Sequence, residues 1–191
     1  VISIFLGLSA DPDLALAAFS IIYGLVSLLM SPMRNLVATA QTLVKTIADR
    51  RPVYFFTLHL VGFFGLIGIV LFHTPLEGYV LEDAMGLRPE LRDYCAPALK
   101  IAFLMSACWA YSALFRGFLA GARATTMLAA SGVSRVGVAA LISSITMLFA
   151  TANGAVIGLV AWMAGYAAEA GLLALQLRRL DARRALGDIG S

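Results

Sequence analysis

The chain has 191 residues, of which 61% are hydrophobic and 13% are charged, and its mean hydropathy is +0.89. This composition excludes an ordinary soluble domain, in which about a quarter of the residues are charged, and indicates a polytopic membrane protein. The net charge of +3 does not indicate a nucleic-acid partner, because the basic residues gather at predicted helix ends rather than on one soluble face.

Apolar runs separated by breaker residues predict one partial membrane span and five full ones, because a bilayer core of about 30 Å needs about 20 apolar helical residues. The partial span covers about residues 1–9. The chain starts at Val and this first run is half a span, so we expect an excerpt of a longer protein that begins inside a helix. The full spans are expected at 13–47, 53–73, 94–121, 124–150 and 153–177. The predicted fold class is all-α, a transmembrane helix bundle over 1–177.

Three segments depart from straight spans. The range 13–47 is too long for one straight crossing, so we expect a kink near Pro32 and an overhang beyond the membrane. Residues 73–93 form the longest polar stretch, and 76–85 is a candidate for a short interfacial helix. Residues 178–191 are expected to form a basic, solvated tail.

Positive charges collect in alternate connections, which predicts the orientation of the chain. Lys and Arg residues lie near residue 48, near residue 122 and in the C-terminal tail, whereas the connections between them are acidic or uncharged. Because positive residues favour the cytoplasmic side, we expect a multi-pass protein of the plasma (inner) membrane. Its C-terminus is expected to be cytoplasmic and its acidic 73–93 segment to lie outside.

Three ionisable residues lie deep inside otherwise apolar helices: Arg34, Arg135 and Glu169. An unpaired charge in hydrocarbon costs about 2.5–3.5 kcal/mol on insertion scales, so such residues face a bundle interior or a wet cavity. At a rise of about 1.5 Å per residue they lie about 17 Å, about 18 Å and about 13–14 Å from the basic ends of their helices. Two cations and one anion leave one positive charge uncompensated, which indicates an anionic solute.

Each of these buried charges is expected to have a polar partner or to face a cavity. Arg135 and Glu169 lie on the last two spans, which a short turn joins, so we predict a buried pair that is either structural or part of a gate. Glu169 is alternatively a titrating group that couples a proton to transport. Arg34 either lines a cavity or pairs with Glu169 or with a part of the protein outside this chain. Pro32 either frees carbonyl groups for a ligand or only kinks its helix.

Four more polar residues are candidates for the same site. Asn35 follows Arg34, and Ser131 and Ser134 are expected to share an inward-facing small and polar helix face with Arg135. Arg116 lies about one turn from the cytoplasmic end of its span. It is expected to anchor that end or to guard the inner mouth of a cavity.

Small residues at four-residue spacing occur at 117–121 and 154–158, both of which read GxxxG. Such spacing lets helices approach closely, so we expect close helix packing at both places.

No motif supports enzyme chemistry. His59 and His73 lie at different depths without a carboxylate or cysteine at ligand spacing, so no metal site is expected. The sequence contains neither G-x-S-x-G nor a Gly-rich phosphate loop after a strand. We expect neither catalytic activity nor a cofactor.

Several short segments, taken in order, resemble one family of membrane proteins. Asn153-Gly-Ala-Val-Ile-Gly-Leu-Val followed by Ala164-Gly-Tyr-Ala-Ala-Glu169 is similar to the His-Gly-Ala-x-x-Gly turn and the Ala-Gly-Phe-x-x-Glu of the last helix in the progressive ankylosis family. Further similar segments are His-Thr-Pro at 73–75, Met-Gly-Leu at 85–87, Phe115-Arg-Gly-Phe-Leu-Ala-Gly121 and Leu128-Ala-Ala-Ser-Gly-Val-Ser-Arg135. Pro32 matches the family's Met-Pro-Tyr-Gly stretch, whereas Arg34 does not.

That family is similar to the multidrug and oligosaccharide-lipid flippase superfamily. The resemblance implies one six-helix half, with its first helix partial, of a two-half MATE-like transporter that works by alternating access. It implies export of a small anion such as pyrophosphate, a nucleotide or citrate. A proton or another cation is the expected coupling partner. The other half of the cavity would come from the N-terminal part of the parent protein or from a second copy.

Three functions therefore compete. The first is a secondary-active exporter of small anions, which a small arginine-rich cavity would favour. The second is a flippase or antiporter for lipid-linked or drug-like molecules, which a large, apolar, aromatic-lined cavity would favour. The third is a non-transporting membrane scaffold, in which Arg34, Arg135 and Glu169 would all be mutually paired.

Overall fold

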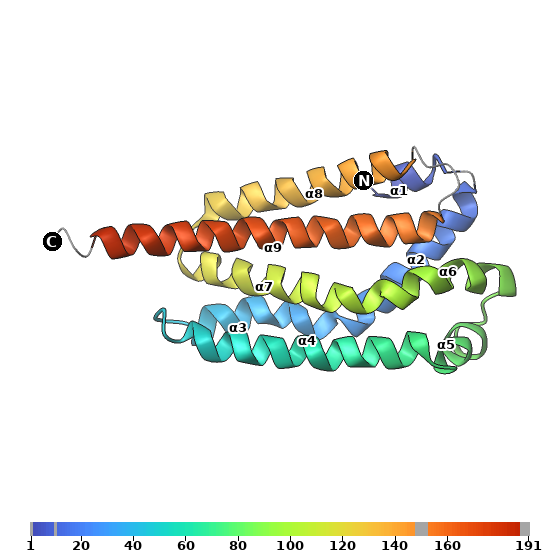
Figure 1. The fold of residues 1–191 in the computed structure, drawn as a ribbon, viewed down its shortest axis with the longest axis horizontal. Coiled ribbons are helices and arrows are strands. Elements are labelled where there is room, and N and C mark those ends of the chain that lie inside the picture. Colours follow the sequence, from blue (N-terminus) through green and yellow to red (C-terminus); the bar gives the residue numbers. More distant parts are fainter. Residues whose placement is uncertain (1, 10, 148–152, 188–191) are drawn as a thin grey trace.

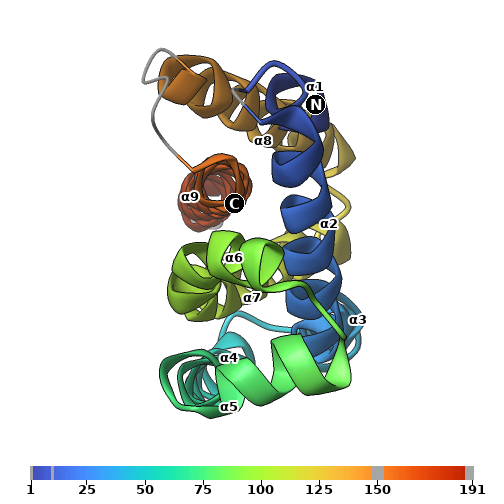
Figure 2. The ribbon, with the colours of Figure 1, turned by 90° about the vertical axis from the view of Figure 1, so that its right-hand side faces the viewer.

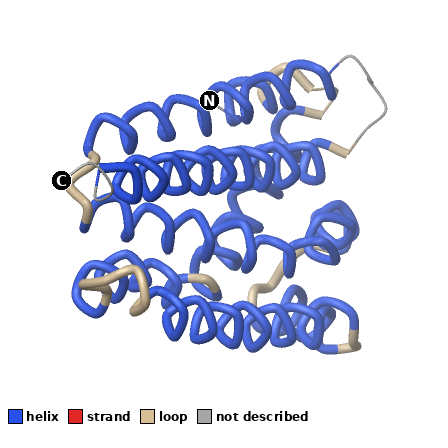
Figure 3. Tube along the Cα trace, turned by 60° about the vertical axis from the view of Figure 1, so that its left-hand side comes forward, coloured by secondary structure: helices blue, strands red, loops and turns tan. Residues whose placement is uncertain are grey.

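The computed structural model describes residues 2–9, 11–147 and 153–187, and every regular element in these residues is helical (Figures 1 and 3). This confirms the all-α helical bundle. The helices are α1 (Ile2–Leu6), α2 (Pro12–Leu29), η1 (Ser31–Asn35), α3 (Leu36–Leu43), α4 (Arg50–His73), α5 (Leu76–Gly78), η2 (Tyr79–Ala84), α6 (Pro89–Ile101), η3 (Ala102–Leu104), α7 (Met105–Gly121), α8 (Thr125–Met147) and α9 (Gly154–Gly187).

Five helical segments in the described residues are long and apolar enough to cross a membrane, which is compatible with a multi-pass membrane protein. They cover Pro12–Leu29, Arg50–His73, Pro89–Gly121, Thr126–Ile145 and Gly154–Arg183.

The long first crossing bends where the sequence predicts it. Pro32 lies in η1, a 3₁₀ turn between α2 and α3, because proline lacks the N–H donor of a regular helix and its ring clashes with the preceding turn. Helix α3 ends at Leu43, before the predicted limit at 47, and Val44 is extended. The carboxylate of Asp49 closes the following turn, because its Oδ2 accepts the backbone N–H groups of Lys45 at 3.0 Å and Thr46 at 2.7 Å.

Helices α7 and α9 form the centre of the bundle. Figures 1 and 2 show α8, α9, α7 and α4 side by side, with α2 and α3 crossing beside them. In the most apolar stretches, 56% of residues are buried in α6–α7 and 44% in α9, against 22% in α4 and 17% in α8. The outer faces of α4 and α8 carry exposed side chains such as Phe63 and Val133, so these two faces are left for lipid or for other protein.

Close packing at both GxxxG spacings is confirmed. A Cβ atom on Gly117 would lie 2.6 Å from the Cβ of Ala40 in α3, and one on Gly158 would lie 2.5 Å from Cδ2 of Phe19 in α2. Gly165 likewise allows close packing of α9 on α8, because a Cβ atom there would lie 2.9 Å from the carbonyl oxygen of Arg135. Helix α9 is thereby held against both α2 and α8.

The connections between helices at one end of the bundle differ in charge from those at the other end. Figure 1 shows the α3–α4 turn, the α7–α8 turn and the C-terminal end of α9 at one end, and the α5–η2 segment at the other. The first three carry the basic residues, whereas the last is acidic. The arrangement is that of a chain whose crossings alternate in direction.

Some predicted boundaries change. Residues 178–187 of the predicted basic tail continue α9 as a helix, so the helix of the last predicted span extends beyond residue 177. Leu, Arg and Ala are strong helix formers, and Asp181 holds this extension against α4 through an ion pair with Arg50. Residues 188–191, and the end of the span predicted at 124–150, lie outside the described residues.

The segments before α6 and after α4 also differ from their predicted bounds. The span predicted from residue 94 begins at Pro89, since proline fits the first turn of a helix, where its missing N–H is not needed. The short helix predicted over 76–85 divides into one α-helical turn, α5, and the π-helical turn η2.

Candidate functional site

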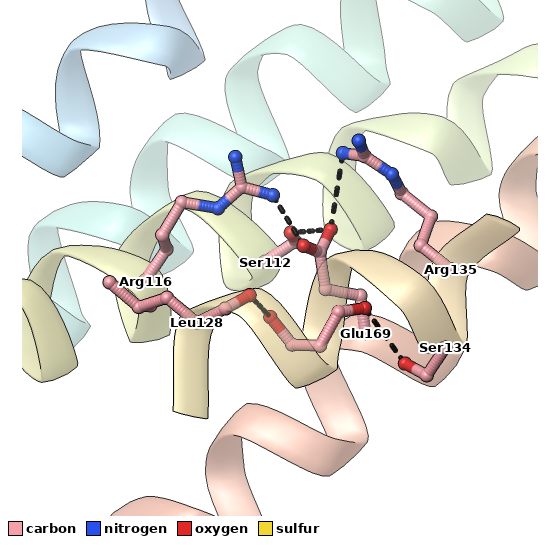
Figure 4. A network of polar contacts seen from close by, with 7 residues as sticks. Ser112, Arg116, Leu128, Ser134, Arg135 and Glu169 are labelled. Atoms are coloured by element: carbon pink, nitrogen blue, oxygen red, sulfur yellow. Dashed lines mark hydrogen bonds and ion pairs between the residues drawn. The ribbon is translucent and has the colours of Figure 1, made fainter. Parts of the chain in front are cut away.

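Glu169 of α9 is the centre of a buried polar network (Figure 4). Its side chain is fully buried, although most of its helix neighbours are apolar. Ser112 Oγ donates to Glu169 Oε2 at 2.8 Å, the Arg116 guanidinium pairs with Oε1, and Arg135 Nη1 lies 3.4 Å from Oε2. The predicted Arg135–Glu169 pair is therefore present, and it belongs to a larger network in which one carboxylate receives donors from α7 and α8.

Ser112 is the member of this network that the sequence analysis did not name, and Arg116 was named in a different role. We expected it to act as an anchor or inner-mouth residue, but it reaches inward to Glu169. Ser112 and Arg116 are four residues apart on α7, so they share one helix face. This four-residue spacing is the feature of the sequence that could have indicated a shared role for Ser112 and Arg116. The depth calculated from helical rise is that of the Cα atom. A long arginine side chain carries its charge well away from its own backbone, so the guanidinium of Arg116 lies deeper than its Cα atom suggests.

Arg34 lies apart from Glu169. In the described part of the chain no carboxylate pairs with it, and its guanidinium lies over the ring of Trp109, with Cζ 5.2 Å from the ring centroid. Arg34 and Arg116 both line a cavity of about 250 Å³. The other lining residues are Tyr23, Val37, Trp109, Ser112, Ala113 and Tyr166.

Aromatic rings separate the arginines and were not predicted as part of the site. Trp109 and Tyr166 stack with their centroids 5.4 Å apart. Arg34 lies on the Trp109 side of this pair, whereas the guanidinium carbon of Arg135 lies 5.0 Å from the Tyr166 centroid. Cation–π contacts of this kind stabilise a cation within about 6 Å of a ring. From sequence alone, these rings could not be told from ordinary core residues.

Pro32 and Asn35 do not line this cavity, in contrast to the prediction. Pro32 lines a separate apolar cavity of about 320 Å³, and the Asn35 side chain is exposed. The reason is the 3₁₀ geometry of η1, in which residues three apart eclipse one another. Pro32 and Asn35 therefore share one face, and Arg34 projects from another.

The predicted cavity positions of Ser131 and Ser134 are not found either. Their hydroxyl groups donate to backbone carbonyl groups of α8, Ser131 to Leu128 and Ser134 to Ser131, each at 2.8 Å. Serine in a helix commonly satisfies its hydroxyl in this way when no other polar group is in reach. Of the small polar face predicted for α8, only Arg135 reaches the network.

The charges of the site do not balance. Arg34 and Arg116 line the cavity, whereas Arg135 and Glu169 do not line it and belong to the site through the Glu169 network. Together the three arginines contribute three positive charges, and Glu169 contributes one negative charge. Among the described residues, Glu169 is the sole carboxylate that pairs with any of these arginines. The formal charge of the site is therefore +2, rather than the +1 counted from the sequence. Guanidinium groups with free donors are suited to the oxygens of carboxylates and phosphates.

The fold and the site together are those of a helical bundle compatible with a multi-pass membrane protein, with a positively charged cavity that opens on the surface of the bundle, where Arg34 is exposed. Comparisons with protein-family models, with curated proteins and with solved structures give no match. The resemblance to the progressive ankylosis family stays a prediction from the short segments that carry it.

Proposed function

We propose that the chain forms part of a secondary-active transporter that exports small anions by alternating access. The observation that carries this proposal is the cavity of about 250 Å³ between Arg34 and Arg116. Arg116 is compensated by Glu169, whereas Arg34 has no carboxylate partner in the described residues. An anion that entered this cavity would meet a formal surplus of positive charge.

The chemistry of the cavity favours a small solute with several anionic oxygens. Arg34 and Arg116 both line it, and this chain contributes about 250 Å³ of its volume. A pyrophosphate, nucleotide phosphate or citrate group offers several oxygens to the two guanidinium groups. The proposal includes a MATE-like architecture, in which a second half completes the cavity, and the basic end of the bundle at the cytoplasmic side.

Glu169 is the proposed coupling group. While it is ionised, Arg116 and Arg135 donate to it. Protonation of Glu169 would cancel its charge and release donors of both arginines for an anion. Anion binding and proton binding would then favour one another by the same factor, so that the anion and the proton would be carried together.

A flippase for lipid-linked or drug-like molecules is the second candidate. It is supported by the aromatic lining of the charged cavity and by the apolar cavity beside Pro32. The scaffold alternative needs Arg34, Arg135 and Glu169 to be mutually paired. The position of Arg34 over Trp109 weighs against it.

The test is efflux of pyrophosphate, ATP and citrate from cells that express the full-length protein. Arg34→Gln should lower the efflux of the transported anion by about tenfold or more, because a hydrogen bond to a charged group contributes about 1.5–3 kcal/mol. Arg88→Gln is the matched control, since Arg88 is exposed at the start of α6 and lines none of these cavities.

Two results would count against the proposal. Normal efflux by Arg34→Gln would remove Arg34 from the substrate site. Absence of efflux of all three anions, from protein shown to be in the membrane, would favour the flippase.

A further inference from the structure

A third cavity lies at the basic end of the bundle and shares no residue with the Glu169 site. It measures about 630 Å³ and is lined by α4, α7 and the C-terminal part of α9. Helices α4 and α9 both pack on α7, and Figure 1 shows them on opposite sides of it. The cavity is therefore a groove over α7, which we call the basic-end groove.

The charged part of the basic-end groove has an excess of cations. Arg50, Arg51 and Arg178 line it together with one carboxylate, Asp181. Arg50 Nη1 pairs with Asp181 Oδ2 at 2.6 Å. Neither Arg51 nor Arg178 has an ion pair within the described residues, so the formal charge of the groove is +2.

Arg50 retains hydrogen-bonding capacity in spite of its burial. Its side chain is 11% exposed, and its Nε atom is buried without a hydrogen-bond partner among the described groups. A buried donor left unsatisfied costs about 1–3 kcal/mol. An acceptor oxygen brought into the groove would relieve that cost.

Polarity changes in steps along the groove. Arg50 and Arg51 stand at the start of α4, Tyr54 and Phe55 follow one turn later, and Leu58 follows one turn after that. At about 1.5 Å per residue, this passage from charge to aromatic ring to aliphatic chain takes about 12 Å. Phe55 and Leu58 are 52% and 53% exposed, so the apolar end opens on the outer surface of the bundle.

We propose that the basic-end groove binds one anionic phospholipid. Its phosphate would lie among Arg50, Arg51 and Arg178, its glycerol and ester groups against Tyr54 and Tyr111, and an acyl chain along Leu58. Aromatic residues favour the level of the lipid headgroups, and basic pockets between membrane helices bind anionic headgroups. A soluble anion would leave the exposed apolar half of the groove unused. This proposal needs the chain to lie in a membrane, but it does not depend on the transported substrate.

The experiment uses purified full-length protein in vesicles of phosphatidylcholine, with or without phosphatidylglycerol. Native mass spectrometry after extraction reports the retained lipid, and thermal unfolding reports its effect on stability. We expect selective retention of phosphatidylglycerol and a higher Tm in its presence. The variant Arg51→Gln/Arg178→Gln should bind phosphatidylglycerol about thirtyfold more weakly, because each basic residue near an anionic surface contributes about a fivefold factor.

The matched control is Arg88→Gln/Lys100→Gln, which removes the same charge from exposed residues outside the groove. It should retain the lipid as the unmodified protein does, and an excess of inorganic phosphate should not displace the lipid. Equal loss in both double variants, equal retention of the two lipids, or displacement by phosphate would each overturn the proposal. Because transport is not measured, its failure is distinct from failure of the anion-exporter proposal.

Discussion

Helix α9 carries two carboxylates that pair with arginines in very different surroundings. Glu169 is fully buried and receives Ser112, Arg116 and Arg135, whereas Asp181, about 18 Å further along the helix, is 28% exposed and pairs with Arg50. In the middle of the bundle the donors must come from neighbouring helices. Near the end of the bundle, Asp181 has one ion-pair partner, and its Oδ1 atom is buried without a hydrogen-bond partner among the described groups. The deeper carboxylate therefore has the larger number of donors around it.

The largest expected effect breaks the deeper network. Glu169→Ala leaves Arg116 and Arg135 without their carboxylate, and removal of one partner from a buried pair costs about 3–5 kcal/mol. Since these arginine side chains are 37% and 33% exposed, we expect the lower end, about 3 kcal/mol in the free energy of unfolding. Asp181→Ala leaves Arg50, whose side chain is 11% exposed, without its carboxylate, and because Asp181 is itself 28% exposed we expect a smaller cost of about 1–2 kcal/mol.

Denaturant unfolding of both variants in the same detergent measures this difference. Glu169→Gln, which keeps an oxygen for Ser112 and Arg116, should lie between the two. Equal destabilisation by Glu169→Ala and Asp181→Ala would show that depth does not separate the two carboxylates.

A smaller effect is expected when the energetic coupling of Glu169 to each of its two arginines is measured separately. Double-mutant cycles that combine Glu169→Gln with Arg116→Gln and with Arg135→Gln should each give a coupling of about 1–2 kcal/mol, because residues in one ion-pair network are not additive. The Arg116 coupling should be the larger, since Arg135 Nη1 lies as far as 3.4 Å from the carboxylate.

The control cycle combines Glu169→Gln with Arg50→Gln. It should be additive within about 0.5 kcal/mol, because Arg50 pairs with the distant Asp181. A coupling to Arg50 as large as that to Arg116 would contradict the division into two networks.

The sequence predicts the features that depend on one helix at a time. Run length and breakers locate the long apolar helices, Pro32 locates the bend, and the short turn before α9 makes Arg135 and Glu169 neighbours. Features that depend on the rotation of one helix against another are missed. Arg116 reaches Glu169 because α7 presents the Ser112 face to α9, and Asn35 is turned away by the 3₁₀ geometry of η1. The four-residue spacing of Ser112 and Arg116 places both on one face of α7, but it does not tell which helix that face contacts.

The predictions for the C-terminal tail gave its charge but not its helical form. Residues 178–187 have high helix propensity but few apolar side chains, so the length of the apolar run ends the predicted span at residue 177. The pair of Asp181 with Arg50 keeps this segment on the bundle. A contact between residues so distant in the sequence cannot be recognised from either segment by itself.

The smallest expected effect extends the comparison to a third carboxylate, at the surface. Asp49 accepts the backbone N–H groups of Lys45 and Thr46 in the α3–α4 turn. These hydrogen bonds, first that of the Thr46 backbone, hold the pKa of Asp49 below its usual value of 3.8. Because the folded-state pKa is depressed, the stabilisation is complete above the unfolded value and is lost only as the pH falls through the folded-state pKa.

Asp49→Asn should therefore lower Tm slightly and by a constant amount between pH 5 and about pH 8, and the difference from the unmodified protein should shrink below about pH 4. Thermal unfolding of the two proteins across this range measures it, with Asp93→Asn as the exposed carboxylate control. A difference that grew on acidification, or that changed near neutral pH, would mean that Asp49 is not held ionised by this turn. Glu169, Asp181 and Asp49 would then not form the series from deep to surface that their surroundings indicate.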